Sequence, residues 1–154
     1  MHIWVDADAC PGPIKEIIFR AANRLEIATT LVANHFLRAP KSPHIRVVQV
    51  GRGFDIADNH ILQHLQADDL VVTQDIPLAA EVIAAGAAAL NPRGTLYTPN
   101  NIKEHLARRD RMDELRSTGI QTGGPSAFDK THTQAFANGL DKYLARAPRS
   151  TDRE

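Results

Sequence analysis

The sequence predicts a three-layer α/β domain in which helices cover both faces of a mainly parallel sheet of about five strands. Short apolar runs alternate with segments whose apolar residues recur at helical spacing, as expected for strand–helix–strand units. The run Leu70–Val72 is apolar without interruption, which is typical of a strand covered on both faces. Glycine and proline lie at the joints between these segments and not in a linker, so residues 1–146 are expected to form a single domain.

The N-terminal half is expected to contain three strands and two helices. The apolar run Ile3–Val5 is the first strand, and the prolines after it precede a helix over Ile14–Leu25, whose apolar residues share one face. Ala28–Val32 and Arg46–Val50 are the next two strands, and a proline-containing loop, Asn34–Pro43, separates them. Apolar residues four positions apart predict a helix over Ile56–Leu65.

The C-terminal half continues the alternation. Asp69–Thr73 is a buried strand, and Pro77–Ala85 follows as a helix, because proline is tolerated in a first helical turn. Ala87–Leu90 is expected to be the fifth strand. Two further helices are predicted, Ile102–Arg116 and Thr133–Ala145. The last residues, Ala147–Glu154, are polar and charged, and we expect a disordered tail there.

Composition favours a soluble cytoplasmic protein. Eighteen basic residues balance eighteen acidic ones, so net charge gives no indication of a polyanionic partner. Cys10 is the sole cysteine, which excludes an intramolecular disulfide framework. No apolar stretch approaches the ~20 residues of a membrane span, and the N-terminus lacks the layout of a signal peptide. We therefore expect no membrane partner, whereas the oligomeric state does not follow from the sequence.

Carboxylates follow two of the predicted strands. Asp6 and Asp8 come directly after the first strand, and Asp75 follows the buried strand that ends near Thr73. The carboxyl ends of parallel strands share one edge of the sheet, which is where ligands bind in open α/β folds. Clustered carboxylates repel one another unless a cation neutralises them. An alternative for Asp75 alone is that it caps the following helix, since aspartate is a favoured N-cap residue.

Another acidic pair precedes and begins the helix predicted at Ile56. Asp55 is expected to be its N-cap, whereas Asp58, one turn further on, is expected to point back at the same sheet edge. Asp6, Asp8, Asp58 and Asp75 are therefore the candidate catalytic residues, and Asp6, Asp58 and Asp75 the candidate metal ligands. Hard cations such as Mg²⁺ or Mn²⁺ prefer oxygen ligands and keep several waters, so a few carboxylates suffice. Such a site can support phosphodiester hydrolysis.

A basic stretch accompanies the acidic residues. No aspartate or glutamate occurs between Ile27 and Phe54, and the loop within this stretch contains Asn34, Arg38 and Lys41. These residues are candidates for holding a nucleic-acid backbone, although an ordinary solvated loop is an equal alternative. Arg93 lies in Asn91-Pro92-Arg93-Gly94 and is a further candidate phosphate ligand. The alternative for that segment is a turn stabilised by asparagine, proline and glycine.

Other residues are assigned structural roles. His60 and His64 are spaced by four, but spacing alone is weak support for a metal site, so surface histidines are expected. Cys10 lies close to a helix start, where a thiol pKa can be lowered, but we expect a small buried residue. Trp4, on the first strand, is expected in the core.

Several segments together resemble a known family. They are Trp4–Pro11, Val32–Asn34, Gly53–Asn59, Asp75–Ala80, Ala89–Gly94, Gly119–Pro125 and Gln134–Asn138. The chain resembles the YaiI/YqxD family of uncharacterised bacterial proteins over about residues 1 to 145. That family is grouped with PIN-like domains, whose characterised members are mostly metal-dependent ribonucleases. The resemblance implies a PIN-like sheet with an acidic cluster at its carboxyl edge, where Asp6, Asp58 and Asp75 match the acidic positions and Asp8 is a further candidate.

One position departs from the family pattern. Members tend to carry an aspartate before the Gln-Ala-Phe-Ala segment, where this chain has His132. Either Asp129 takes the place of that aspartate, or the carboxylate has no role in metal binding.

Three functions remain open at this stage. The first is a Mg²⁺- or Mn²⁺-dependent nuclease that acts on RNA. The second is a phosphatase of the haloacid dehalogenase type, because a strand followed by Asp-x-Asp opens that superfamily's pattern, although its lysine and acidic-pair motif is not evident and the chain is short. Such an enzyme would form an aspartyl phosphate on Asp6. The third is a non-catalytic module that binds nucleic acid or protein.

Overall fold

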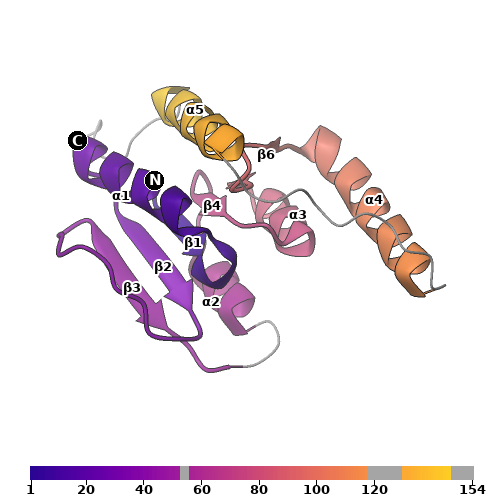
Figure 1. Cartoon of the computed structure of the whole chain (residues 1–154), viewed down its shortest axis with the longest axis horizontal. Helices are drawn as coiled ribbons and strands as arrows, with labels where there is room; N and C mark the ends of the chain where they lie inside the picture. Colours follow the sequence, from indigo (N-terminus) through magenta and orange to yellow (C-terminus); the bar gives the residue numbers. More distant parts are fainter. Residues whose placement is uncertain (53–55, 118–129, 147–154) are drawn as a thin grey trace.

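The fold is a six-stranded sheet between two layers of helices, seen in a computed structural model that describes residues 1–52, 56–117 and 130–146 (Figure 1). The strands lie in the order β3-β2-β1-β4-β5-β6, and all neighbours are parallel except the β5–β6 pair. Their bounds are β1 Ile3–Asp6, β2 Thr29–Ala33, β3 Ile45–Gln49, β4 Leu70–Val72, β5 Ala88–Leu90 and β6 Leu96–Tyr97. The predicted three-layer α/β class is confirmed.

The helices divide between the two faces of the sheet. Their bounds are α1 Gly12–Leu25, α2 Ile56–His64, α3 Ile76–Ala84, α4 Pro99–Ser117 and α5 Lys130–Arg146, and a 3-10 turn, Ala7–Ala9, joins β1 to α1. Helices α1 and α5 contact each other, and residues of both belong to one core cluster. Helices α2 and α3 contribute to the other cluster, and α4 packs on α3.

Side-chain alternation along β1 shows how the sheet separates these two clusters. Ile3 and Val5 pack with α1 and α5, whereas Trp4, between them, packs with α2 and α3. All three are buried, because a central parallel strand is covered on both faces. The prediction that Trp4 lies in the core is therefore confirmed. Asp6 has the same parity as Trp4 and ends the strand at the carboxyl edge.

Strand β6 and the start of α4 were not predicted from the sequence. Strand β6 is only two residues long and pairs antiparallel with β5 across a turn, so it produces no periodicity. Helix α4 begins at Pro99, three residues earlier than expected. Thr98 caps it reciprocally: its hydroxyl accepts from the Asn101 N–H at 3.1 Å, and its own N–H donates to the Asn101 side chain at 2.8 Å. A threonine followed by proline was the overlooked start signal.

Some expectations lie outside the described residues. They concern the cap residue Asp55, the substitute carboxylate Asp129 and the tail at 147–154. Within the described part of the chain, no helix is both long and apolar enough to cross a membrane.

Candidate functional site

The carboxyl ends of β1 and β4 are hydrogen-bonded neighbours, and they bring Asp6, Thr73 and Asp75 together. The Thr73 hydroxyl donates to Asp6 Oδ2 at 2.9 Å, and the Thr73 hydroxyl oxygen accepts the Asp75 backbone N–H at 2.9 Å. Thr73 is fully buried, so this hydroxyl is a fixed link between the two strand ends. The expectation that Asp6 and Asp75 occupy one edge, with a threonine hydroxyl beside them, is confirmed.

The Asp6 carboxyl is electrostatically unfavourable in its ionised form. Burial raises its pKa above the ordinary value, the Thr73 hydrogen bond opposes this shift, and the negative charges of Asp75 and Asp8 raise the pKa further. Asp6 as a residue is 9% exposed, so little water reaches it. A nearby cation would relieve both the desolvation of this carboxylate and its repulsion from its neighbours.

Asp75 also caps helix α3, as the alternative interpretation of the sequence predicted. Its Oδ1 accepts from the Leu78 N–H at 3.0 Å, and Pro77 occupies the first turn of the helix. Capping occupies one carboxylate oxygen. The structural role and a ligand role are therefore compatible, because the second oxygen of a capping carboxylate can still bind a cation.

Asp8 turns toward the neighbouring strand β2. Its two oxygens accept the Asn34 backbone N–H at 3.2 and 2.9 Å, and its Oδ1 lies 2.7 Å from His35 Nδ1. Asn34 thus contributes its backbone N–H here, and the carboxylate fixes the imidazole ring of His35 at the site. This role of His35 was not predicted from the sequence. The available signal was its position directly after β2, the strand that pairs with β1.

Asp58 lies half-buried in the first turn of α2, a helix that packs against β1, β2 and α3. Among residues 1–52, 56–117 and 130–146, no three side chains of histidine, cysteine, aspartate or glutamate converge closely enough to enclose a metal ion. The predicted ligand set of Asp6, Asp58 and Asp75 is therefore not assembled as a triad in this arrangement. A cation at Asp6 and Asp75 would complete its shell with water.

The segment after β5 forms the predicted turn. Asn91 Oδ1 accepts the Arg93 N–H at 2.7 Å, and Gly94 has φ +103°. The Arg93 guanidinium donates to His132 Nε2 at 3.2 Å, since arginine has no acceptor. His132, which is expected at the position of the family aspartate, thus contacts the candidate phosphate ligand. Arg93 lies at the same edge as the carboxylates, because β5 is parallel to β4.

The loop between β2 and β3 begins at this edge as well. Arg38 and Lys41 are both exposed on it, as expected for residues that would contact a nucleic-acid backbone. The loop then crosses to the opposite edge, because β3 runs parallel to β2 and begins level with Thr29. Arg38 lies early in this loop, whereas Lys41 precedes Ser42, whose hydroxyl donates to the Asn23 side chain in the last turn of α1. Lys41 therefore lies toward the edge opposite the carboxylates, and the structure does not bring it to the predicted site.

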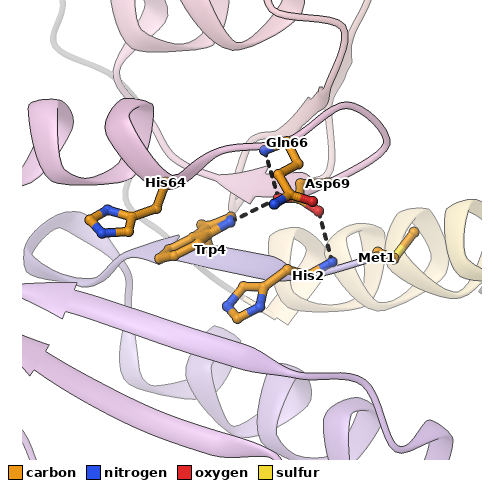
Figure 2. A pocket seen from close by; sticks show the side chains of 6 residues that line it. All are labelled: Met1, His2, Trp4, His64, Gln66 and Asp69. Atoms are coloured by element: carbon orange, nitrogen blue, oxygen red, sulfur yellow. Dashed lines mark hydrogen bonds between the residues drawn. The ribbon is translucent and has the colours of Figure 1, made fainter. Parts of the chain in front are cut away.

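A separate hollow of about 370 Å³ lies at the opposite edge, where β1 and β4 begin (Figure 2). Asp69 is central to it and accepts three hydrogen bonds: from the His2 N–H at 3.0 Å, the Trp4 indole at 3.1 Å and the Gln66 N–H at 3.0 Å. The His2 ring stacks on Trp4 with centroids 4.3 Å apart. Because these hydrogen bonds within the protein use both oxygens of the Asp69 carboxylate, we assign this network a structural role.

The residues expected to be structural behave accordingly. Cys10 is buried, and burial raises its pKa to about 12, so the thiol is not activated. His64 is exposed, stacks on His60 with centroids 4.4 Å apart, and donates through Nδ1 to the His60 carbonyl at 2.8 Å.

Comparisons with known proteins agree with the resemblance seen in the motifs. Residues 4–146 match the family described as "Uncharacterized BCR, YaiI/YqxD family". A UPF0178 protein of Dechloromonas aromatica (strain RCB) is 62% identical over 148 residues, which cover 96% of this chain and 99% of that protein. A UPF0178 protein of Bordetella avium (strain 197N) is 62% identical over 146 residues, which cover 95% of each chain. One from Shewanella sp. (strain MR-7) is 60% identical over 147 residues, with 96% and 97% covered.

Proposed function

Since the chain belongs to the YaiI/YqxD family, whose description names no activity, we propose a function from the carboxyl edge itself: metal-dependent hydrolysis of phosphodiester bonds in RNA. The observation that carries this proposal is the linked pair Asp6 and Asp75. A buried carboxylate with a raised pKa lies beside a second carboxylate, and a threonine hydroxyl holds the two strand ends together. The PIN-like relationship suggested by the motifs is part of the same proposal.

The donor set fits Mg²⁺ or Mn²⁺. These cations take oxygen ligands, and Mg²⁺ is commonly held by one or two carboxylates and several waters. Asp6 and Asp75 would hold the ion, and Asp58 or Asp8 would orient a water molecule at the rim. Once bound, such an ion lowers the pKa of its water and neutralises charge on the phosphate.

The remaining residues of the edge would position the substrate. Arg93 presents a guanidinium suited to a phosphate, and its contact with His132 limits the directions in which the side chain can point. Arg38, early in the loop that follows β2, would attract the RNA backbone beside the cleaved bond. Thr73 keeps Asp6 in place and so has a positioning role.

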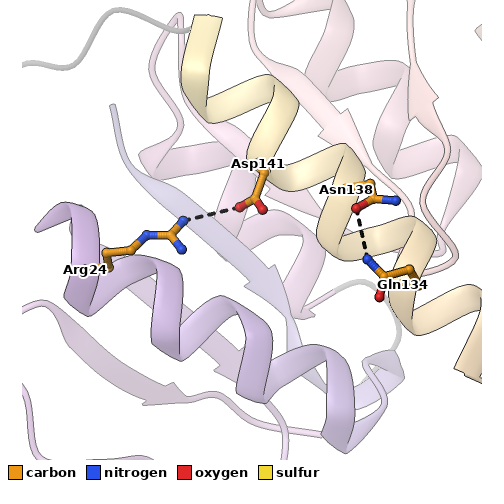
Figure 3. A network of polar contacts seen from close by, with 4 residues as sticks. All are labelled: Arg24, Gln134, Asn138 and Asp141. Carbon is orange, nitrogen blue, oxygen red and sulfur yellow. Dashed lines mark hydrogen bonds and ion pairs between the residues drawn. The ribbon is translucent and has the colours of Figure 1, made fainter.

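The test compares the wild type with Asp6→Asn on labelled single-stranded RNA, with Mg²⁺, with Mn²⁺ and with a chelator. A suitable control is Asp141→Asn, because Asp141 is an exposed carboxylate on α5 that pairs with Arg24 of α1 at 3.2 Å (Figure 3). Cleavage should require the metal and Asp6, and should survive the loss of Asp141. Equal cleavage by wild type and Asp6→Asn would refute the proposal.

Two alternatives give different results in the same experiment. Turnover of a small phosphomonoester but not of RNA, with a phosphoryl group trapped on Asp6, would identify a phosphatase of the haloacid dehalogenase type. Binding of RNA without cleavage under either metal would identify a binding module.

A further inference from the structure

Phe36 is the most exposed of the large apolar residues in the described part of the chain. It is 75% exposed, against 38% for Ile56 and 38% for Leu96. Isolated exposed apolar residues are common on soluble proteins, so exposure by itself carries no argument. The position of Phe36 and the way the loop holds it are the relevant observations.

The loop is anchored on both sides of Phe36. On the N-terminal side, His35 pairs with Asp8 at 2.7 Å, and the Asn34 N–H donates to the same carboxylate. On the C-terminal side, Leu37 packs against the core cluster that contains β1 and α1. His35 and Leu37 both contact the rest of the protein, so the backbone at Phe36 is anchored while its ring is exposed to solvent. Such pre-organisation lowers the entropy cost of using the ring in binding.

The surroundings of the ring match one kind of ligand. Phe36 follows the end of β2, the strand beside β1, so it lies at the edge that carries Asp6. Arg38 follows it two residues later on the same loop and is exposed, and no carboxylate occurs in the sequence from Ile27 to Phe54. An aromatic ring beside a cation is a common platform on which proteins stack the bases of single-stranded nucleic acids.

We propose that Phe36 stacks on an unpaired base of a single-stranded RNA whose backbone passes along the Asp6 edge. This inference rests on the proposed function, because it takes the ligand of that edge to be RNA. It adds the substrate class: the base must be unstacked, so single strands bind and a continuous duplex, whose base faces are already covered, does not.

The test measures binding of a fluorescein-labelled oligouridylate by anisotropy in chelator, where metal-dependent cleavage is suppressed. Phe36→Ala should weaken binding about tenfold, by the usual contribution of one stacked base. Phe36→Tyr should bind like the wild type, and Phe36→Leu, which is apolar without a ring, should bind like Phe36→Ala. Annealing the probe to oligoadenylate should remove the dependence on Phe36. Leu96→Ala, on the edge strand β6, is the matched control for loss of an exposed apolar side chain.

The outcomes separate this inference from the nuclease proposal. Cleavage by the wild type, with unchanged KM and affinity in Phe36→Ala, would overturn the stacking inference and leave the nuclease standing. RNA binding that depends on the Phe36 ring, without cleavage under Mg²⁺ or Mn²⁺, would support the stacking inference and overturn the nuclease proposal. No RNA binding by the wild type would overturn both proposals. Full RNA binding by Phe36→Leu would overturn the stacking inference, because an apolar side chain without a ring would then suffice. Loss of a dimer in Phe36→Ala during sedimentation, without a change in RNA affinity, would show that Phe36 is an apolar contact for a second copy of the chain instead.

Discussion

Replacing Asp6 by asparagine is expected to stabilise the fold when no metal is present. The change removes a negative charge that is buried and close to Asp75 and Asp8, while an asparagine oxygen can still accept from the Thr73 hydroxyl. A charge-assisted hydrogen bond becomes a neutral one, which costs about 1 kcal/mol. The pKa of Asp6 is raised even with that bond present, so desolvation and repulsion outweigh it.

The net change should be a gain, because a raised pKa means that the ionised carboxylate is less favourable in the folded protein than in the unfolded chain. For a chain of this size, each kcal/mol gained raises the melting temperature by about 2–4 °C. The effect has a defined pH dependence. A raised carboxyl pKa means that the stability contributed by protonated Asp6 is complete below its ordinary value of 3.8 and is lost as the pH rises through the folded-state pKa. The advantage of Asp6→Asn should therefore be present at pH 7 and vanish below pH 3.8.

Thermal unfolding in chelator at several pH values measures this directly, and Asp141→Asn serves as the exposed-carboxylate control. Adding Mn²⁺ should reverse the order of stability, because a ligand at a hundredfold its Kd stabilises the protein that binds it by about 2.7 kcal/mol. A lower melting temperature for Asp6→Asn at pH 7 in chelator would refute the reasoning, since it would mean that the ionised carboxylate stabilises the fold.

Three further predictions concern separate features. Asp75→Asn should keep the α3 cap and melt like or above the wild type, whereas Asp75→Ala should lose about 1 kcal/mol; equal melting of both variants would contradict the capping role. Burial lowers the pKa of His2, so its contribution to stability should be complete above pH 6.5 and fall as the pH drops through the folded-state value. Quenching of the single tryptophan, Trp4, should report this with a midpoint below 6.5. His2→Gln should reduce that transition and leave only the part due to His60 and His64, whose ring centroids lie farther from Trp4, at 6.4 and 6.0 Å against 4.3 Å for His2. Gly94→Ala should destabilise the protein by about 2 kcal/mol or more, because a Cβ there would lie 2.8 Å from the Ala135 backbone at φ +103°, whereas Gly12→Ala has nothing within 4 Å and should not destabilise it.

The sequence predicts the fold well where periodicity and burial coincide. Leu70–Val72 was assigned from an unbroken apolar run, and it is a central strand because both faces are covered by helices. Strand β6 was missed because two residues cannot show a period, and their conformation depends on pairing with β5. That pairing includes a turn in which the Asn91 amide donates to the Tyr97 hydroxyl at 2.8 Å, a contact that depends on tertiary structure.

The candidate site was predictable only in part. Matching positions after two strands placed Asp6 and Asp75 at one edge, since strand ends follow from the chain order of the elements. The direction of Asp8 was not predictable, because it depends on β2 being the other neighbour of β1, which presents the Asn34 N–H and His35 to that carboxylate. Nor does the sequence indicate that Asp58 fails to complete a triad, since that depends on how α2 packs.

The electrostatics of the edge bear on whether the fold alone can accommodate the acidic residues. Helices α1 and α3 begin just after β1 and β4, so the positive ends of their dipoles lie at the carboxyl edge. Each such end stabilises a nearby carboxylate by roughly 0.3–1 kcal/mol. Asp75 gains most directly, because it caps α3. Asp6 is buried at the end of β1, the strand next to β4. Its pKa is raised despite the helix dipoles and the Thr73 hydrogen bond. Backbone and hydroxyl donors therefore offset only part of the cost of this charge, and a cation drawn from solvent is the interaction that would offset the rest.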